Sequence, residues 1–287
     1  MEKAKSLKSA WIMLTNQCNL KCSYCWLTSR IKNKKEVVMD LNTATRAVDY
    51  LNSVGEDGVH ISFFGGEPLL EFETIKGVIG KYPYLNYGLY TNTILLTNEK
   101  LDYLYEHRDF IRVILSIDGL QSTNLKWRGC NYDESIARRV FRDFPTSMAR
   151  FTVLDPKTLF DGVKYLHSLG APKITVNTPH FVNLTADYYK SFDEEVGRIK
   201  GDFRLNSITS LSDCRIRSFC HAGIDFMAVS PDGGLYPCDL FYWFDKNRLG
   251  DIWNGVDEKA LKEYLSQVES VENIDSSCIA EHLYYRH

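Results

Sequence analysis

Apolar positions in the first two-thirds of the chain alternate between strand-like runs and helix-like segments. In residues 41–54, apolar side chains recur at helical spacing, whereas residues 111–117 form the continuous apolar run typical of a buried parallel strand. The predicted strands are 11–14, 59–64, 87–91, 111–117, 148–153 and 173–177. The predicted helices are 41–54, a stretch opening at Glu67 and Pro68, 98–106, 132–143 and 156–168. About six βα repeats predict an α/β fold, a partial (β/α)6 barrel similar to a TIM barrel.

The pattern changes near residue 205. Residues 226–238 read as two short strands around a Pro-Asp-Gly-Gly turn, which is a hairpin signal, and an amphipathic helix follows at 256–268. No long linker, low-complexity segment or internal repeat interrupts the chain. We therefore expect a barrel domain over residues 1–205 and a small α+β module over residues 206–287.

Composition and charge exclude several classes of protein. The chain has 287 residues, of which 44% are hydrophobic and 25% charged, as in ordinary globular proteins. A net charge of -3 provides no general attraction to nucleic acid or to an acidic membrane. There is no apolar run long enough for a transmembrane helix or a signal peptide, so we expect a cytoplasmic protein.

Three of the eight cysteines, Cys18, Cys22 and Cys25, follow the first predicted strand with the spacing C-x3-C-x2-C. In a reducing compartment such a pattern favours metal binding over disulfides. Structural zinc would need a fourth ligand nearby, and a redox pair of Cys22 and Cys25 would leave Cys18 unexplained. Three thiolates on a four-iron cluster instead leave one iron open to an outside ligand.

This cysteine loop resembles that of the radical S-adenosylmethionine (radical SAM) enzymes. The resemblance implies a [4Fe–4S] cluster whose open iron chelates S-adenosylmethionine, which electron transfer splits to a 5′-deoxyadenosyl radical. It also implies that Tyr24, just before the third cysteine, lies against the adenine. Phe64 and the residues Gly65, Gly66, Glu67 and Pro68 follow the second predicted strand and resemble the family's GGEP element, which meets the methionine amino group. Their alternative is a plain strand-to-helix turn with proline at the helix start.

Ser116 and Arg128 belong to the segments SIDG and WRG, which resemble a pair found in peptide-modifying radical SAM enzymes. The resemblance implies that both hold the methionine carboxylate, a group that an arginine fork matches. The alternatives are a strand cap at Ser116 and a surface position for Arg128. Asn92, with Thr91, ends the third strand and is predicted to lie at the same barrel end, with turn chemistry as its alternative.

A second set of cysteines, Cys214, Cys220, Cys238 and Cys278, lies near the C-terminus. It resembles the SPASM and twitch extensions of radical SAM enzymes, and the single late cysteine matches the twitch form better. The resemblance implies a second, auxiliary [4Fe–4S] cluster. Zinc, unligated cysteines, and three ligands with substrate on the fourth iron are the alternatives. Cys130 has no partner in this scheme and is expected to be a small buried side chain.

Asp239 follows Cys238 in a stretch, 235–252, that resembles anaerobic sulfatase-maturating enzymes. There the equivalent aspartate accepts a proton, so Asp239 is a candidate general base, with a turn cap as its alternative. The missing second run of cysteines weakens this analogy.

The leading hypothesis is a peptide maturase that oxidises or crosslinks a side chain, with the auxiliary cluster accepting the electron. No recognition domain precedes the first strand, so a peptide would need a separate recognition protein or an open groove. A reductant such as flavodoxin or ferredoxin is implied. The alternatives are a small-molecule radical SAM dehydrogenase of the twitch type and a non-catalytic Fe–S or zinc protein.

Overall fold

A computed structural model describes residues 7–27, 35–211, 222–242, 247–269, 278 and 280 of the chain. The described residues fall into two compact units. The first unit is drawn from residues 1–18, 33–89 and 217–287, and the second from residues 19–32 and 90–216. No helix of the described residues is long and apolar enough to cross a membrane.

The first unit is built on strand β1 (Leu7–Thr15), which pairs in parallel with β2 (Gly55–Gly65) on one side and with β8 (Phe226–Val229) on the other. Beyond β2 the beginning of β3 (Asn86–Thr91) continues the parallel arrangement. Beyond β8 the order is antiparallel, through β9 (Gly234–Tyr236), β10 (Gly250–Asp251) and β11 (Gly255–Val256). The remaining elements of this unit are α2 (Leu41–Val54), the 3-10 turn η1 (Pro68–Glu71), α3 (Phe72–Lys81), the 3-10 turn η3 (Asp239–Phe241) and α10 (Glu258–Glu269).

Helix α2 illustrates how the local sequence sets an element of this unit. Asp40 precedes the helix, and its carboxylate accepts a hydrogen bond of 2.7 Å from the Thr43 N–H, which is a standard N-cap. Ala44, Ala47 and Val48 on the apolar face are fully buried, while the cap is exposed. The helix therefore begins and ends where the spacing of apolar residues predicts.

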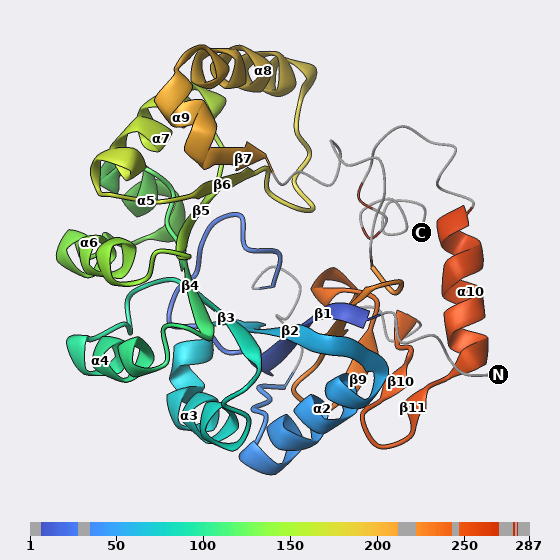
Figure 1. The fold of residues 1–287 in the computed structure, drawn as a ribbon. Coiled ribbons are helices and arrows are strands. Elements are labelled where there is room, and N and C mark those ends of the chain that lie inside the picture. Colours follow the sequence, from blue (N-terminus) through green and yellow to red (C-terminus); the bar gives the residue numbers. More distant parts are fainter. Residues whose placement is uncertain are drawn as a thin grey trace. The chain divides into compact units, whose positions relative to one another are not determined.

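The second unit contains four parallel strands in the order β4 (Ile111–Ser116), β5 (Met148–Thr152), β6 (Ile174–Asn177) and β7 (Thr209–Leu211). In Figure 1 the helices of this unit lie along one side of these strands. They are α4 (Asn98–Glu106), α5 (Gln121–Arg128), α6 (Glu134–Asp143), the 3-10 turn η2 (Pro156–Thr158), α7 (Leu159–Ser168), α8 (Ala186–Gly201) and α9 (Phe203–Ile208). The alternation of strand and helix confirms the predicted α/β fold with a mostly parallel sheet.

The C-terminal hairpin is also present. Strands β8 and β9 pair antiparallel across the predicted turn, in which Gly233 adopts a φ of 76°. A Cβ at this position would lie 2.6 Å from the Trp253 ring, so both the conformation and the space favour glycine. The division of the chain near residue 205 stays a prediction.

Candidate functional site

The cysteine loop begins three residues after β1 ends. Cys25 donates its backbone N–H to the carbonyl of Cys22 over 3.1 Å, which closes a tight turn between these two cysteines. Ser23 in that turn donates its N–H to the carbonyl of Trp127 over 2.8 Å. Cys18, Cys22 and Cys25 are all partly exposed. The loop is therefore anchored by backbone bonds, with its thiols at accessible positions.

The three thiols match the donor type that holds iron–sulfur clusters. Among the described residues, no three His, Cys, Asp or Glu side chains are grouped closely enough to hold one metal ion. Cysteines of a four-iron cluster bind different irons, so they lie farther apart than the ligands of a single ion. A short loop with three partly exposed thiols fits that donor set.

The Gly-Gly-Glu-Pro segment lies directly against the chain that leads to Cys18. Gly66 donates its N–H to the carbonyl of Thr15 over 2.9 Å, and Glu67 donates its N–H to that of Gln17 over 2.8 Å. A Cβ on Gly66 would lie 1.8 Å from the Gln17 carbonyl oxygen, which no side chain can occupy. Glycine is required here because two backbone segments touch. The predicted approach of this backbone to a ligand is a separate, still untested role.

Glu67 is buried, with 1% of its surface exposed. Its carboxylate accepts the N–H of Leu69 over 3.1 Å and so caps η1, with Pro68 in the first turn. The strand-to-helix turn that was the plain alternative is therefore present. The predicted contact of Glu67 with the methionine amino group stays a prediction.

Asp118 organises a buried polar network in the second unit. Its carboxylate accepts hydrogen bonds from the Tyr24 hydroxyl over 2.6 Å, from Arg128 Nε and Nη2 over 2.9 and 3.0 Å, and from the Thr152 N–H over 3.1 Å. The Arg128 guanidinium also lies over the Tyr24 ring, 5.5 Å from its centroid. Asn124 accepts the Asp118 N–H over 3.0 Å. One carboxylate thus joins the cysteine loop, α5 and β5.

Burial and charge shift two pKa values in this network. Burial alone would lower the pKa of Arg128, but the Asp118 carboxylate outweighs it and holds that pKa above its ordinary value. Burial raises the pKa of Tyr24 well above its usual range, and Arg128 only partly offsets this. Arg128 is therefore charged and Tyr24 a neutral hydrogen-bond donor at physiological pH.

The structure places the other cofactor candidates of the second unit as follows. Ser116 is the last residue of β4 and is partly exposed. Asn92 is buried; its amide donates to the Asn19 side chain over 2.7 Å, and its oxygen accepts the Ile94 N–H over 3.1 Å. Thr91 accepts the Thr93 N–H over 3.1 Å. Side-chain hydrogen bonds typical of turns, the alternative role for these residues, are thus present at Thr91 and Asn92. Asn92 also bonds to Asn19, the residue directly after Cys18.

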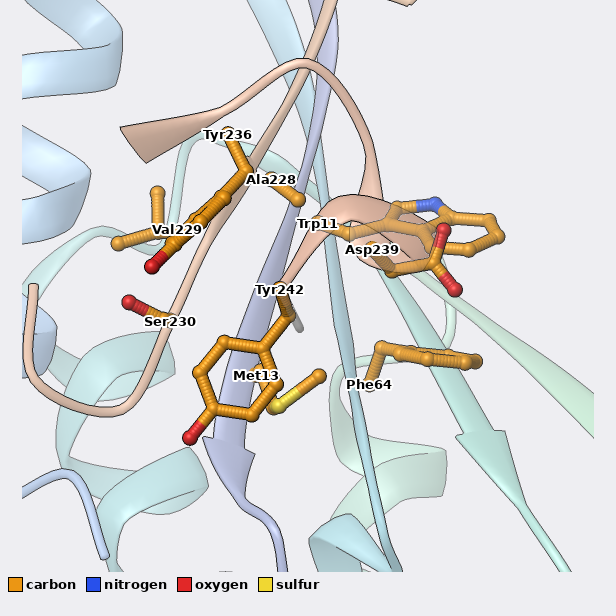
Figure 2. Close-up of a pocket in the computed structure, with 9 residues that line it drawn as sticks. All are labelled: Trp11, Met13, Phe64, Ala228, Val229, Ser230, Tyr236, Asp239 and Tyr242. Atoms are coloured by element: carbon orange, nitrogen blue, oxygen red, sulfur yellow. The ribbon is translucent and has the colours of Figure 1, made fainter. Parts of the chain in front are cut away.

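Asp239 lines a small, largely apolar pocket in the first unit (Figure 2). The Trp11 and Phe64 rings stack with their centroids 4.7 Å apart, and the carboxylate of Asp239 lies on their side of the pocket. Only 8% of Asp239 is exposed. The other lining residues are Met13, Ala228, Val229, Ser230, Tyr236 and Tyr242. A carboxylate among aromatic rings can accept a proton from a group held in this pocket.

The late cysteines are described only in part. Cys214 and Cys220 lie outside the described residues; Cys238 is partly exposed and Cys278 is buried. Gly223, three residues after Cys220, donates its N–H to the carbonyl of Pro237, the residue before Cys238, over 3.1 Å. Cys130 is half-buried, with Asn124 Nδ2 3.9 Å from its sulfur, and burial raises its pKa.

Sequence reasoning missed several residues that the structure brings to these sites. Asp118 was visible as the acid of the SIDG segment, directly after a buried strand, but its partners were not predictable. The aromatic lining residues are Trp11 of β1, Tyr236 of β9 and Tyr242, which directly follows η3. No local sequence pattern joins them.

The fold and the cysteine loop define a class: α/β proteins with a mostly parallel sheet and a short three-cysteine loop after the first strand. The sequence matches the radical SAM superfamily over residues 12–196. This chain belongs to that superfamily. The family implies a [4Fe–4S] cluster and S-adenosylmethionine.

Two relatives illustrate the range of similarity. An uncharacterized protein, MJ0907, of Methanocaldococcus jannaschii is 32% identical over 59% of this chain and 62% of its own length. The match thus spans less than two thirds of that relative. A cysteine-type anaerobic sulfatase-maturating enzyme of Clostridium perfringens is 24% identical over 91% of this chain and 80% of its own length.

Solved structures support the fold. The chain resembles anSMEcpe with bound AdoMet, with a TM-score of 0.71 at 23% identity over 89% of this chain and 77% of that one. It also resembles Streptococcus suis SuiB bound to the precursor peptide SuiA, with a TM-score of 0.74 at 14% identity over 91% and 67%. The predicted partial-barrel class is confirmed by these neighbours, whereas the C-terminal module is not separately confirmed.

Proposed function

We propose that this protein is a radical SAM enzyme that oxidises or crosslinks a side chain of a peptide. The observation that carries the proposal is the pocket in which the Asp239 carboxylate adjoins an aromatic lining, one residue from Cys238. It gains support from the sulfatase-maturating relative, whose alignment covers most of this chain, and from the neighbour that was solved with a precursor peptide.

The cofactor residues of the proposal are those of the sequence prediction. Cys18, Cys22 and Cys25 hold the cluster, and Glu67 with the glycines before it meets the amino group of S-adenosylmethionine. When bound, the two cofactors supply a 5′-deoxyadenosyl radical that abstracts a hydrogen atom. Tyr24 and Arg128 act from the buried network that Asp118 organises, which fixes their orientation. Ser116, partly exposed at the end of β4, and Asn92, bonded to Asn19, complete the cofactor set.

Asp239 takes the proton that the substrate loses when it is oxidised. Asp239 is buried and lines the same pocket as the stacked rings of Trp11 and Phe64. Burial of this kind strengthens the interaction of the carboxylate with any donor that enters the pocket. The aromatic lining favours an apolar or small side chain over the polar molecule expected of a small-molecule dehydrogenase.

The proposal includes an auxiliary cluster held by Cys214, Cys220, Cys238 and Cys278, which accepts the electron. The proposal draws on the resemblance of these four cysteines to the twitch extension and on the position of Cys238 beside Asp239, at the pocket. Four thiolates close the coordination of such a cluster, so it serves electron transfer rather than substrate binding.

The experiment measures 5′-deoxyadenosine after anaerobic reconstitution, with dithionite and S-adenosylmethionine. We expect the wild-type protein to form 5′-deoxyadenosine and Cys22→Ala to form none. Asp239→Asn should still cleave S-adenosylmethionine but no longer oxidise a peptide substrate, since only the proton acceptor is removed. Cys130→Ala, outside the proposed ligand set, is the matched control and should behave as the wild type.

Two outcomes would contradict the proposal. Iron incorporation without any cleavage of S-adenosylmethionine would indicate a non-catalytic Fe–S protein. Equal peptide oxidation by wild type and Asp239→Asn would remove Asp239 from the mechanism.

A further inference from the structure

The turn between Cys22 and Cys25 is bonded to the end of helix α5, and both belong to the second unit. The carbonyl of Trp127 accepts a hydrogen bond from the N–H of Ser23 over 2.8 Å and another from its hydroxyl over 3.2 Å. Ser23 is exposed and Trp127 is partly exposed. Two of the three cysteine thiols therefore belong to a turn that meets α5 at the surface of the protein.

Exposed apolar and basic side chains accompany this turn. Leu125 on α5 has 52% of its surface exposed. Lys126, the next residue of the helix, is exposed, and its Nζ lies 4.3 Å from the centroid of the Trp127 ring. Lys21 directly precedes Cys22 and is also exposed. Neither lysine forms an ion pair with a described residue, so both ammonium groups are available to a partner.

The two segments that meet here carry no acidic residue. Residues 19–35 contain five Lys or Arg, residues 119–132 contain two, and neither range contains Asp or Glu. Of these basic residues, Lys21 and Lys126 are exposed beside the turn. Because the whole chain has a net charge of -3, the positive charge is concentrated locally rather than spread over the protein. A local concentration of this kind directs an acidic partner to one place.

The position of these lysines beside the cysteine turn indicates what such a partner does. A cluster held by the loop takes up its electron from outside the chain, and electron tunnelling becomes steeply slower with distance. A donor protein must therefore dock close to the thiols. Contacts between electron carriers are small and transient, and complementary charge sets the rate at which they form. One exposed leucine with two unpaired lysines suits a contact of that kind.

We propose that Lys21, Leu125, Lys126 and Trp127 form the docking surface for a small acidic protein that carries single electrons. The lysines attract the partner, and the leucine and the indole ring provide the apolar centre of the contact. The inference rests on the proposed function in one respect, namely that the cysteine loop holds a cluster that is reduced by one electron.

The probe is flavodoxin, a small acidic flavoprotein, and the protein is the anaerobically reconstituted chain. Titration calorimetry with oxidised flavodoxin, at low and at high salt and without S-adenosylmethionine, measures binding alone. Stopped-flow absorbance then measures electron transfer from reduced flavodoxin. In that step the anionic flavin hydroquinone loses one electron and becomes the neutral semiquinone, while the cluster gains the electron and no proton moves.

The test variant is Lys21→Glu with Lys126→Glu. The matched control is Lys190→Glu with Lys200→Glu, which changes two exposed lysines of α8 in the same unit and lowers the net charge equally. Leu125→Ala tests the apolar part of the surface. Iron content and the 5′-deoxyadenosine formed with dithionite, a small reductant that needs no docking surface, show that the cluster of each variant is intact.

We expect Lys21→Glu with Lys126→Glu to bind flavodoxin about tenfold more weakly than the wild type at low salt, and the difference to shrink at high salt, where charges are screened. Leu125→Ala should weaken binding about threefold to tenfold at both salt concentrations, because an apolar contact is not screened. Flavin oxidation should slow in both variants, whereas cleavage driven by dithionite should match the wild type.

Equal weakening by the two double variants would overturn the surface, because it would reduce the effect to net charge. Failure of the wild type to bind flavodoxin would also overturn it, as would unchanged binding in the test variant. If Lys21→Glu disturbs the loop and iron is lost, Lys126→Glu and Leu125→Ala, both on α5, decide the matter by the same measurements. The proposed function fails separately, when the wild type with dithionite does not cleave S-adenosylmethionine.

Discussion

Asp118 shows how much a single buried carboxylate can organise in this protein. It is fully buried and accepts hydrogen bonds from Tyr24, Arg128 and the Thr152 backbone, which together satisfy the acceptor positions of a carboxylate. Removing one partner of a buried ion pair costs about 3–5 kcal/mol, because the remaining charge has no compensation. The orientation of Tyr24 and Arg128 therefore depends on the charge of this residue.

Asp118→Asn is expected to lower the unfolding free energy by about 3–5 kcal/mol, since the substituted amide is neutral and leaves the Arg128 charge buried. It should also weaken S-adenosylmethionine binding if Tyr24 and Arg128 act as proposed. Chemical denaturation measures the first effect. The perturbation of the cluster's electron paramagnetic resonance spectrum by S-adenosylmethionine measures the second.

Arg142→Gln is the control for this prediction, because Arg142 pairs with Asp143 at an exposed position. The Arg142→Gln substitution should change the unfolding free energy by no more than about 0.5 kcal/mol. If Asp118→Asn behaved like Arg142→Gln, the network would have no structural importance.

Tyr24→Phe tests the hydroxyl of the same network. The ring and its contact with Arg128 stay, while the bond to Asp118 is lost, so we expect a loss of about 1.5–3 kcal/mol in unfolding free energy. The raised pKa of Tyr24 predicts further that no ionisation of this tyrosine appears in absorbance up to pH 10, because its unshifted value is 10.0. A phenolate signal from Tyr24 below that pH would contradict the burial of the hydroxyl.

For single residues, the sequence indicated which side chains belong to the site more successfully than it indicated which groups those side chains contact. Arg128 was expected to bind a carboxylate, and it does contact one, but the carboxylate belongs to Asp118 of this chain. The sequence could not indicate this, because the contact depends on how α5 is placed beside β4. Whether Arg128 also meets S-adenosylmethionine remains a prediction.

Among the elements, the turn after β2 is the one most constrained by backbone packing. Gly65 has a φ of 139°, and a Cβ there would lie 2.4 Å from the Thr15 carbonyl oxygen. At Gly66 the corresponding contact is shorter still. The two glycines thus allow the end of β2 to lie against the segment that carries Cys18.

Gly66→Ala is expected to displace this turn from residues 15–17 and to lower the unfolding free energy by several kcal/mol, about the cost of a severe backbone clash. It should also reduce iron incorporation, because the segment before Cys18 moves with the turn. Gly80→Ala is the matched control. Gly80 lies in α3 with nothing within 4 Å of its would-be Cβ, so alanine should stabilise the helix by about 0.5–1 kcal/mol.

Thermal melting and iron content of both variants check this prediction. Wild-type iron content in Gly66→Ala would show that the turn does not position the cysteine loop.

Most helices and strands were predictable because their apolar residues recur with a clear period, as in α2. Helix α5 was not. Its buried residues are Thr123, Asn124 and Arg128, all of them polar, so there was no apolar stripe to detect. Asn124 and Arg128 bond to Asp118. Strand β7, with three residues, is too short for any period to appear.

For the whole molecule, the two sets of cysteines predict two separate contributions to stability. Metal binding to a site absent from the unfolded chain adds its binding free energy to folding. The changes in unfolding free energy that mutations cause add when the mutations are at independent sites, and do not add when they affect one shared site. Reconstituted protein should therefore melt at a higher temperature than protein stripped of iron with a chelator.

The last prediction separates the two clusters by counting iron. The wild type should hold about eight irons, because it carries two four-iron clusters. The Cys18/Cys22/Cys25→Ala variant should hold about four, because it lacks the ligands of one cluster. Cys238→Ala with Cys278→Ala should remove the other cluster, and its loss in melting temperature should add to that of the triple variant, because each cluster has its own ligands. Cys130→Ala should leave both quantities unchanged. About four irons in the wild type falling to none in the triple variant would instead leave the late cysteines structural or bound to zinc, and the electron would then need another acceptor.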